Sequence, residues 1–406
     1  MRFRQFVAMS LFLELSVLSA HAAAPVDEFV YVGTYVFGPP SHAEVSDQRA
    51  APQQGIYGAR LDVGTGRLSS LGLSVEIKRA SWLITHPSLP ILYSLSQIPG
   101  DNPASDSAVI SFAIDPKSGA LRQLNQMDAH GLDATHMAFD AASQTVFVAH
   151  HGSGNLTDLP VESDGSLRPV ASDLKDFGSG PTARQKSAMA HGVAVDPTHH
   201  DVVVADFGAD RLFVYRFDGA SRLLTPATVP FLQLSPGSGP RHLLFHPKGR
   251  FLFVNNELTG EICSYQWDSR GERLTLAHCR SPYSADYSGR KSAAEISISR
   301  DGRFLYLSLR GDQEALIAYA IDMVSGALTE IQRISPPGKI PWSFGIDPSG
   351  RWMVVADQGS NSVAVLAIDA KSGRLTATGE STPIPNPVTV AFYSPLTHPP
   401  SRRRGE

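Results

Sequence analysis

The feature that most constrains this chain is a hairpin-like unit that recurs along most of its length. In 245–257 (FHPKGRFLFVNNE), an apolar run is followed by a short turn containing Pro and Gly and by a second apolar run. Two apolar runs joined in this way are typical of a β-hairpin. Six complete copies can be aligned: 84–97, 138–152, 194–208, 245–257, 297–311 and 345–359.

A second motif follows each copy and sets the spacing of the repeat. It is a predicted strand ending near Asp, a polar turn, and a Leu that opens another strand. Its seven Leu positions lie 46 to 56 residues apart: 68, 121, 167, 223, 274, 328 and 375. This spacing fits one four-stranded blade per repeat.

The seventh hairpin is split between the two ends of the chain. Residues 29–35 (FVYVGTY) match the second strand of the unit, and residues 388–395 (VTVAFYSP) match the first. A ring closed in this way leaves no open sheet edge. We therefore predict an all-β, seven-bladed β-propeller whose last blade combines one C-terminal strand with three N-terminal strands.

Composition agrees with a single large β domain. Of 406 residues, 42% are hydrophobic, 18% are charged, 34 are Gly and 29 are Pro, which suits short strands and tight turns. The net charge of -4 and the lack of a basic stripe argue against nucleic-acid binding. We predict one domain over 23–395, a disordered tail over 396–406, and a monomer, since nothing indicates an oligomer.

The N-terminus resembles an export sequence. Arg2 is followed by a mostly apolar run over 6–18 and by the small–x–small sequence Ala20–Ala22. We predict a signal peptide over 1–22 and a periplasmic or secreted protein. The alternative, an uncleaved anchor, is disfavoured by Glu14 and the short run. No other segment is apolar enough to cross a membrane.

The two cysteines flank a predicted turn at 268–273 almost symmetrically. In an oxidising compartment Cys263 and Cys279 are candidates for a cross-strand disulfide. Two separate buried thiols remain the alternative.

Several motifs together resemble the lactonase propeller family. They are YVGTY, AHGVAVDP, GPRHLLFHP, VNNEL and AAEISISRDGRFLYLSLRG, within a resemblance that spans 29–393. The family contains bacterial 6-phosphogluconolactonases and fungal carboxymuconate lactonising enzymes. The resemblance implies a propeller fold and a lactone or sugar-acid substrate. The sequence contains no phosphate-binding glycine loop, no HExxH and no paired CxxC, so we predict no cofactor and no metal.

Hairpin geometry indicates where a site would lie. The start of each first strand and the end of each second strand should meet at one face of the ring, here called the mouth. Among the aligned residues at those positions, five are ionisable, and all come from four consecutive blades: His151, His191, Arg241, Glu257 and Arg310. Charges scattered on an exposed rim are the alternative.

The resemblance places the family's proposed catalytic residues on His191, Arg241, Glu257 and Arg310. Lactone opening needs an activated water, stabilisation of an oxyanion and protonation of the ring oxygen. Glu257 or His191 could be the general base, and the two arginines could stabilise the anion. We favour His191 as the proton shuttle, because an ordinary imidazole titrates near neutrality. A histidine that serves only packing is the alternative.

Further side chains are expected near the mouth. Family members often carry Arg where this chain has Trp342, which adds an aromatic platform and argues against a phosphorylated substrate. The segment 36–54 is either a lid or a disordered insertion. The candidate substrate-binding residues are His151, His242, Glu295, Trp342, Arg184 and Arg290.

Other functions stay open. A muconate-type lactonising cycloisomerase could use the same residues in the opposite direction. A non-catalytic propeller that binds a partner or a polysaccharide is also compatible with the fold. A metal bound by His136, His150 and His151, or a calcium-dependent gluconolactonase mechanism, is a further possibility.

Overall fold

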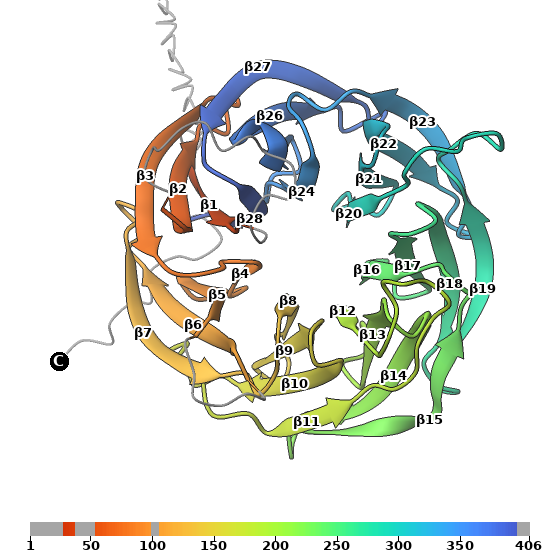
Figure 1. Cartoon of the computed structure of the whole chain (residues 1–406). Coiled ribbons are helices and arrows are strands. Elements are labelled where there is room, and N and C mark those ends of the chain that lie inside the picture. The colour runs from red at the N-terminus through yellow and green to blue at the C-terminus, as the bar shows by residue number, and fades with distance from the viewer. Residues whose placement is uncertain (1–26, 37–52, 99–104, 396–406) are drawn as a thin grey trace, which may run out of the picture.

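The repeats form a closed ring of blades. The computed structural model describes residues 27–36, 53–98 and 105–395. It contains seven four-stranded antiparallel sheets around a central channel (Figure 1), so the predicted all-β, seven-bladed propeller is confirmed. The predicted signal peptide, the predicted tail and most of 36–54 lie outside the described residues.

Each blade runs from an inner strand at the channel to an outer strand at the rim. The inner strands are β4 Leu83–Thr85, β8 Ala134–Asp140, β12 Ala190–Val195, β16 Pro240–Phe245, β20 Ala293–Ile298, β24 Pro341–Ile346 and β28 Pro387–Tyr393. The second strands are β1 Glu28–Thr34, β5 Ile91–Gln97, β9 Thr145–His150, β13 Asp201–Asp206, β17 Phe251–Asn256, β21 Phe304–Arg310 and β25 Trp352–Asp357. A 3-10 turn, η1 Gln358–Ser360, follows β25.

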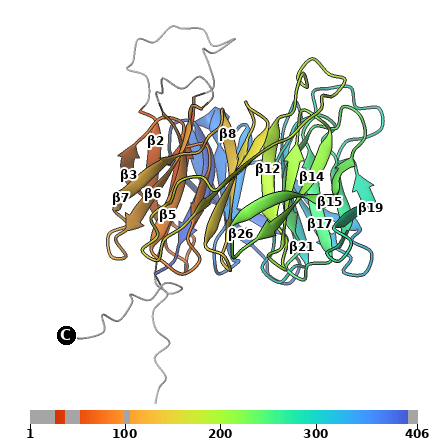
Figure 2. The same ribbon diagram turned by 90° about the horizontal axis from the view of Figure 1, so that it is seen from below.

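The remaining strands form the outer half of each blade. The third strands are β2 Gly55–Leu61, β6 Ser107–Ile114, β10 Asn155–Pro160, β14 Arg211–Asp218, β18 Ile262–Asp268, β22 Glu314–Ile321 and β26 Ser362–Ile368. The outer strands are β3 Leu68–Glu76, β7 Leu121–Asp128, β11 Ser172–Lys175, β15 Leu223–Gln233, β19 Arg273–Arg280, β23 Leu328–Ile334 and β27 Leu375–Pro383. Seen from the side, the ring is a disc with loops on two opposite faces (Figure 2).

The ring is closed as the split repeat predicts. The sheet order β28-β1-β2-β3 joins the C-terminal strand to three N-terminal strands. β28 runs antiparallel to β1, with Tyr393 opposite Phe29 and Thr389 opposite Gly33. The two ends of the domain are therefore held by a strand ladder rather than by a covalent link.

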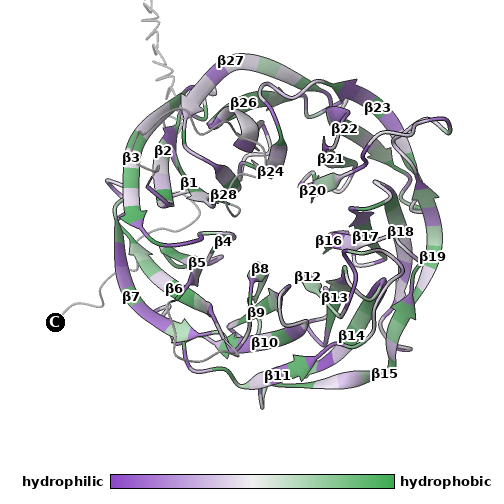
Figure 3. Cartoon of the chain, viewed as in Figure 1, coloured by the Kyte–Doolittle hydropathy of each residue, from purple (hydrophilic) through white to green (hydrophobic). Residues whose placement is uncertain are grey.

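Burial is concentrated between blades. Seven clusters of buried apolar side chains each join two neighbouring blades, so the last blade packs on the first. Val203 of β13, for example, shares a cluster with Leu252 of β17. The outer strands carry both hydrophilic and hydrophobic residues, as half-exposed strands do (Figure 3).

One expected strand start is wrong. Five of the seven Leu residues open an outer strand and Leu274 is second in β19, but Leu167 forms only an isolated bridge with Val161. The outer strand of that blade, β11, begins at Ser172. Pro169 lies between them, and its missing N–H cannot continue a ladder.

The two cysteines are joined. Cys263 in β18 lies directly opposite Cys279 in β19, and the two form a disulfide. Of the two alternatives, the structure has the cross-strand bond. Within the described ranges, no helix has the length and apolarity needed to cross a bilayer.

Candidate active site

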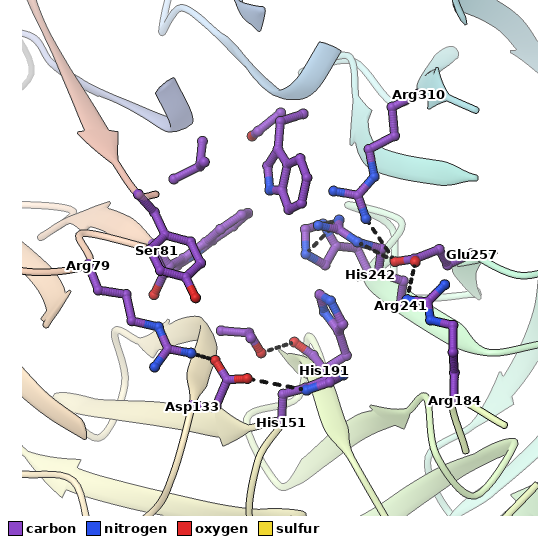
Figure 4. A pocket seen from close by; sticks show the side chains of 16 residues that line it. Arg79, Ser81, Asp133, His151, Arg184, His191, Arg241, His242, Glu257 and Arg310 are labelled. Atoms are coloured by element: carbon purple, nitrogen blue, oxygen red, sulfur yellow. Dashed lines mark hydrogen bonds and ion pairs between the residues drawn. The ribbon is translucent and has the colours of Figure 1, made fainter. Parts of the chain in front are cut away.

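The four predicted catalytic side chains converge on one cavity at the mouth of the ring (Figure 4). His191 lies in β12 and Arg241 in β16, both inner strands, whereas Arg310 ends β21 and Glu257 directly follows β17. The cavity has a volume of about 160 Å³. The geometric prediction, that starts of inner strands and ends of second strands meet, accounts for this convergence.

Irregular pairing at the start of the inner strands orients His191 and Arg241 toward the cavity. The ladder shifts register between Ala190 and Gly192, and again between Pro240 and Leu243. His191 is therefore the extra residue of one bulge, and Arg241 lies with His242 in another; a bulge bends a strand and redirects a side chain. The same shift occurs around Trp342 in β24.

Glu257 is the hub of the charged cluster. One of its oxygens accepts a hydrogen bond from Arg184 at 2.7 Å, and the other accepts one from Arg310 at 2.9 Å and lies 3.3 Å from Nε of Arg241. Burial alone would raise the pKa of Glu257, but the three guanidinium groups outweigh it and hold the pKa at about 2. The group is a permanent carboxylate whose oxygens are both occupied.

His191 lines the same cavity, as do His151 and His242. It is buried, and its Nδ1 has no hydrogen-bond partner in the protein. Its ring lies against those of His151 and His242, with centroid distances of 5.5 and 5.3 Å. Burial and the charge of Arg241 hold the pKa of His191 well below its usual range, so the ring is neutral at pH 7 and able to accept a proton.

Trp342 covers one side of the cluster. The guanidinium carbon of Arg310 lies 3.6 Å from the centroid of its ring, which is a cation–π stack. The guanidinium of Arg241 is 6.0 Å from the same ring. An aromatic surface therefore stands at the position where the resemblance leads one to expect a further cation.

Excess positive charge characterises the cavity. Its lining contains four arginines and two carboxylates, Glu257 and Asp133, and therefore carries two surplus positive charges while the imidazoles are neutral. Such a cavity favours a negative charge that develops on a bound molecule. Among the described residues, no group of three or more His, Cys, Asp or Glu is placed to hold a metal ion.

Comparison with known proteins identifies the fold family. Residues 29–392 match the family model described as lactonase, seven-bladed β-propeller. The chain belongs to the seven-bladed lactonase propeller family. It is 30% identical to a 6-phosphogluconolactonase of Bacillus subtilis over 363 residues, which cover 89% of this chain and 97% of that protein.

A solved structure gives a second comparison for this lactonase propeller. The periplasmic gluconolactonase of Pseudomonas aeruginosa is 30% identical and superposes with a TM-score of 0.81. The match covers 91% of this chain and 99% of the other.

The other candidate substrate-binding residues of the lactonase propeller divide into two groups. His151, His242, Arg184 and Trp342 line the cavity. Arg290 does not: its guanidinium pairs with Asp312 at 3.6 Å. Glu295 lies beneath the cavity and contacts two of its lining residues, His242 and Ser343.

Sequence reasoning missed the opposite wall of the cavity. Asp133 forms an ion pair with Arg79 and lies 3.5 Å from Nδ1 of His151 (Figure 4). Arg79 and Asp133 precede Ser81 and Thr135 by two residues, and both have positive φ, 57° and 54°. Arg79 and Asp133 occupy equivalent positions in two repeats. An alignment of the repeats that included the loops would have identified them as candidate site residues.

Proposed function

We propose that this protein hydrolyses the lactone of an unphosphorylated sugar acid in the periplasm or outside the cell. The observation that carries the proposal is the pairing, in one cavity, of a neutral buried imidazole with three guanidiniums held by one carboxylate. These are a base and an anion-stabilising group, the two elements that ester hydrolysis requires.

The chemistry follows from these groups. Water attacks the lactone carbonyl while His191 takes one of its protons, and Arg241 and Arg310 stabilise the resulting oxyanion. When the tetrahedral intermediate collapses, the bond from carbon to ring oxygen breaks and His191 returns the proton to that oxygen. The product is a hydroxy acid, which ionises to a carboxylate and one proton.

Glu257 is better suited to orienting the arginines than to acting as the base. A carboxylate with a pKa of about 2 and three guanidinium contacts is a weak proton acceptor. Of the two base candidates, the geometry therefore favours His191. Its low pKa weakens it as a base, but negative charge developing on the substrate would offset the repulsion from Arg241.

The choice of an unphosphorylated substrate rests on three observations. Trp342 offers an aromatic face to a sugar ring instead of a cation to a phosphate. The N-terminal sequence resembles an export sequence, and sugar phosphates are mainly cytoplasmic. One relative of known structure is called a periplasmic gluconolactonase, although the B. subtilis relative is called a 6-phosphogluconolactonase.

A substrate panel tests the proposal. The chain from Ala23 would be assayed against gluconolactone, 6-phosphogluconolactone and a muconolactone, with Glu257→Gln beside it. We expect the highest kcat/KM on gluconolactone and a loss of at least 10²-fold in the variant, the scale of a lost transition-state donor. Glu162→Gln, an exposed glutamate paired only with Arg168 at the surface, serves as the matched control.

Other outcomes would support other functions. Interconversion of the muconolactone alone would favour the cycloisomerase. Failure with all three lactones, or activity that is indifferent to Glu257→Gln, would contradict the catalytic assignment and favour a binding propeller.

A further inference from the structure

Four imidazoles form a column through the centre of the ring. His151, His191, His242 and His136 lie in contact in that order, with successive ring centroids 5.5, 5.3 and 4.9 Å apart. Burial is the main cause that lowers the pKa of each of them. The column leads away from the mouth cavity.

A second cavity lies at the far end of this column. It has a volume of about 550 Å³ and is lined by Glu295 and His136, among others. Trp82 and His242 line both cavities, so they form the floor of the first and the ceiling of the second. A side chain next to this layer can act on the candidate active site through His242 without contacting the substrate.

Three hydrogen-bonding contacts hold the Glu295 carboxylate in this floor. One oxygen is 3.0 Å from Nδ1 of His242 and 3.0 Å from the backbone N–H of Ile296, and the other accepts a hydrogen bond from Ser343 at 2.8 Å. Only 5% of its surface is exposed. The contact with Glu295 favours a proton on Nδ1 of His242 and makes Nε2, which lies 3.1 Å from Nη1 of Arg241, the acceptor.

The titratable and polar side chains around Glu295 come from three other strands. Arg241 and His242 face it from β16, His136 from β8 and Ser343 from β24. Burial raises the pKa of Glu295 to about 7, although Arg241, the Ser343 hydrogen bond and His136 act in the opposite direction. Glu257, by contrast, stays a carboxylate near pH 7, because its three guanidinium contacts hold its pKa at about 2.

We propose that Glu295 and His242 are a proton-accepting pair that positions the histidine column and removes the proton released when the lactone opens. The proposal rests on the proposed lactonase function. The product acid loses its proton to neutral His191. That proton passes along the column through His242 to the Glu295 carboxylate, which becomes a carboxylic acid and loses the proton to the second cavity. Glu295 is thus a positioning residue, because it never touches the substrate.

The pH dependence of kcat distinguishes this role from a structural one. Turnover requires ionised Glu295. In the wild type, kcat for gluconolactone should therefore rise with pH through an apparent pKa near 7 and then level off; this rise is here called the limb. His191 contributes no limb there, because its lowered pKa keeps it neutral throughout. In Glu295→Gln, which keeps the size and the contact with Ser343, kcat should fall at least tenfold, KM should change little, and the limb should vanish.

Ser343→Ala provides the second variant. It leaves the carboxylate in place but removes a hydrogen bond that stabilises its charge, so the limb should move to higher pH. A purely structural role would lower kcat without moving the limb. Persistence of the limb in Glu295→Gln, or an unmoved limb in Ser343→Ala, would overturn the proposal.

An infrared titration of Glu295 tests the proton-accepting pair independently of any catalytic activity. The difference between wild type and Glu295→Gln should contain a protonated carboxyl band that disappears near pH 7. Absence of that band would refute the pair even in an inactive protein, whereas inactivity on every lactone would refute the proposed function alone.

Discussion

Trp342 is the single residue that most separates this site from the one that the family resemblance implies. Its ring lies 3.6 Å from the guanidinium carbon of Arg310, and it thereby takes the place of a cation on the cavity wall. The stack leaves Arg310 free to hold Glu257 at 2.9 Å. We therefore expect Trp342 to determine substrate choice at this wall.

Replacing that side chain should change which lactone is preferred. In Trp342→Arg, the ratio of kcat/KM for 6-phosphogluconolactone to that for gluconolactone should rise by roughly tenfold or more, since a hydrogen bond to a charged group contributes about 1.5–3 kcal/mol. Steady-state kinetics on both lactones measure the ratio. Trp342→Phe, which keeps an aromatic face, should leave it near the wild-type value, and an equal rise in both variants would contradict this explanation.

At the scale of elements, the seam between β28 and β1 decides whether the ring is closed. Gly33 lies opposite Thr389 in this ladder, and the register shifts between Gly33 and Thr34. A Cβ added to Gly33 would lie 2.6 Å from Cγ2 of Thr389 and still closer to the carbonyl oxygen of Ala80 in the next blade. The glycine of the YVGTY motif is therefore required by close packing.

Gly33→Ala should weaken the closure of the ring. We expect a loss of about 1–3 kcal/mol in the free energy of unfolding, the usual cost of overpacking, because backbone atoms cannot move aside cheaply. Urea denaturation followed by tryptophan fluorescence measures it. Gly219→Ala, whose new Cβ would meet its nearest neighbour at an ordinary 3.4 Å, is the control; equal midpoints for the two variants would show that the seam tolerates the added carbon.

The bulges of the inner strands mark the limit of prediction at this scale. Pattern and spacing place His191 and Arg241 at strand starts, because the period of the repeat fixes strand order. They do not reveal that each of these residues lies in a bulge. A bulge is set by how a strand pairs with its neighbour, and one repeat read alone does not contain that information. The pattern also did not predict that Leu167 forms only an isolated bridge and that the outer strand begins later, at Ser172, although Pro169 lies between the two residues.

At the scale of the whole molecule, the ring brings together side chains that are far apart in the chain. Blade count, closure and the meeting of His191, Arg241, Glu257 and Arg310 were predictable, because a periodic sequence allows equivalent positions to be aligned. Arg79 and Asp133 were not, because they lie in loops outside the aligned unit. The position of Glu295 beneath the cavity depends on the depth of the channel, which no one-dimensional pattern records.

The most direct test of the account is the initial rate of gluconolactone opening by His191→Gln beside the wild type at pH 7, with circular dichroism to confirm the fold. If His191 is the base, kcat should fall by roughly 10²–10⁴-fold, the usual contribution of a general base. A folded variant that retains the wild-type rate would show that His191 is not the base.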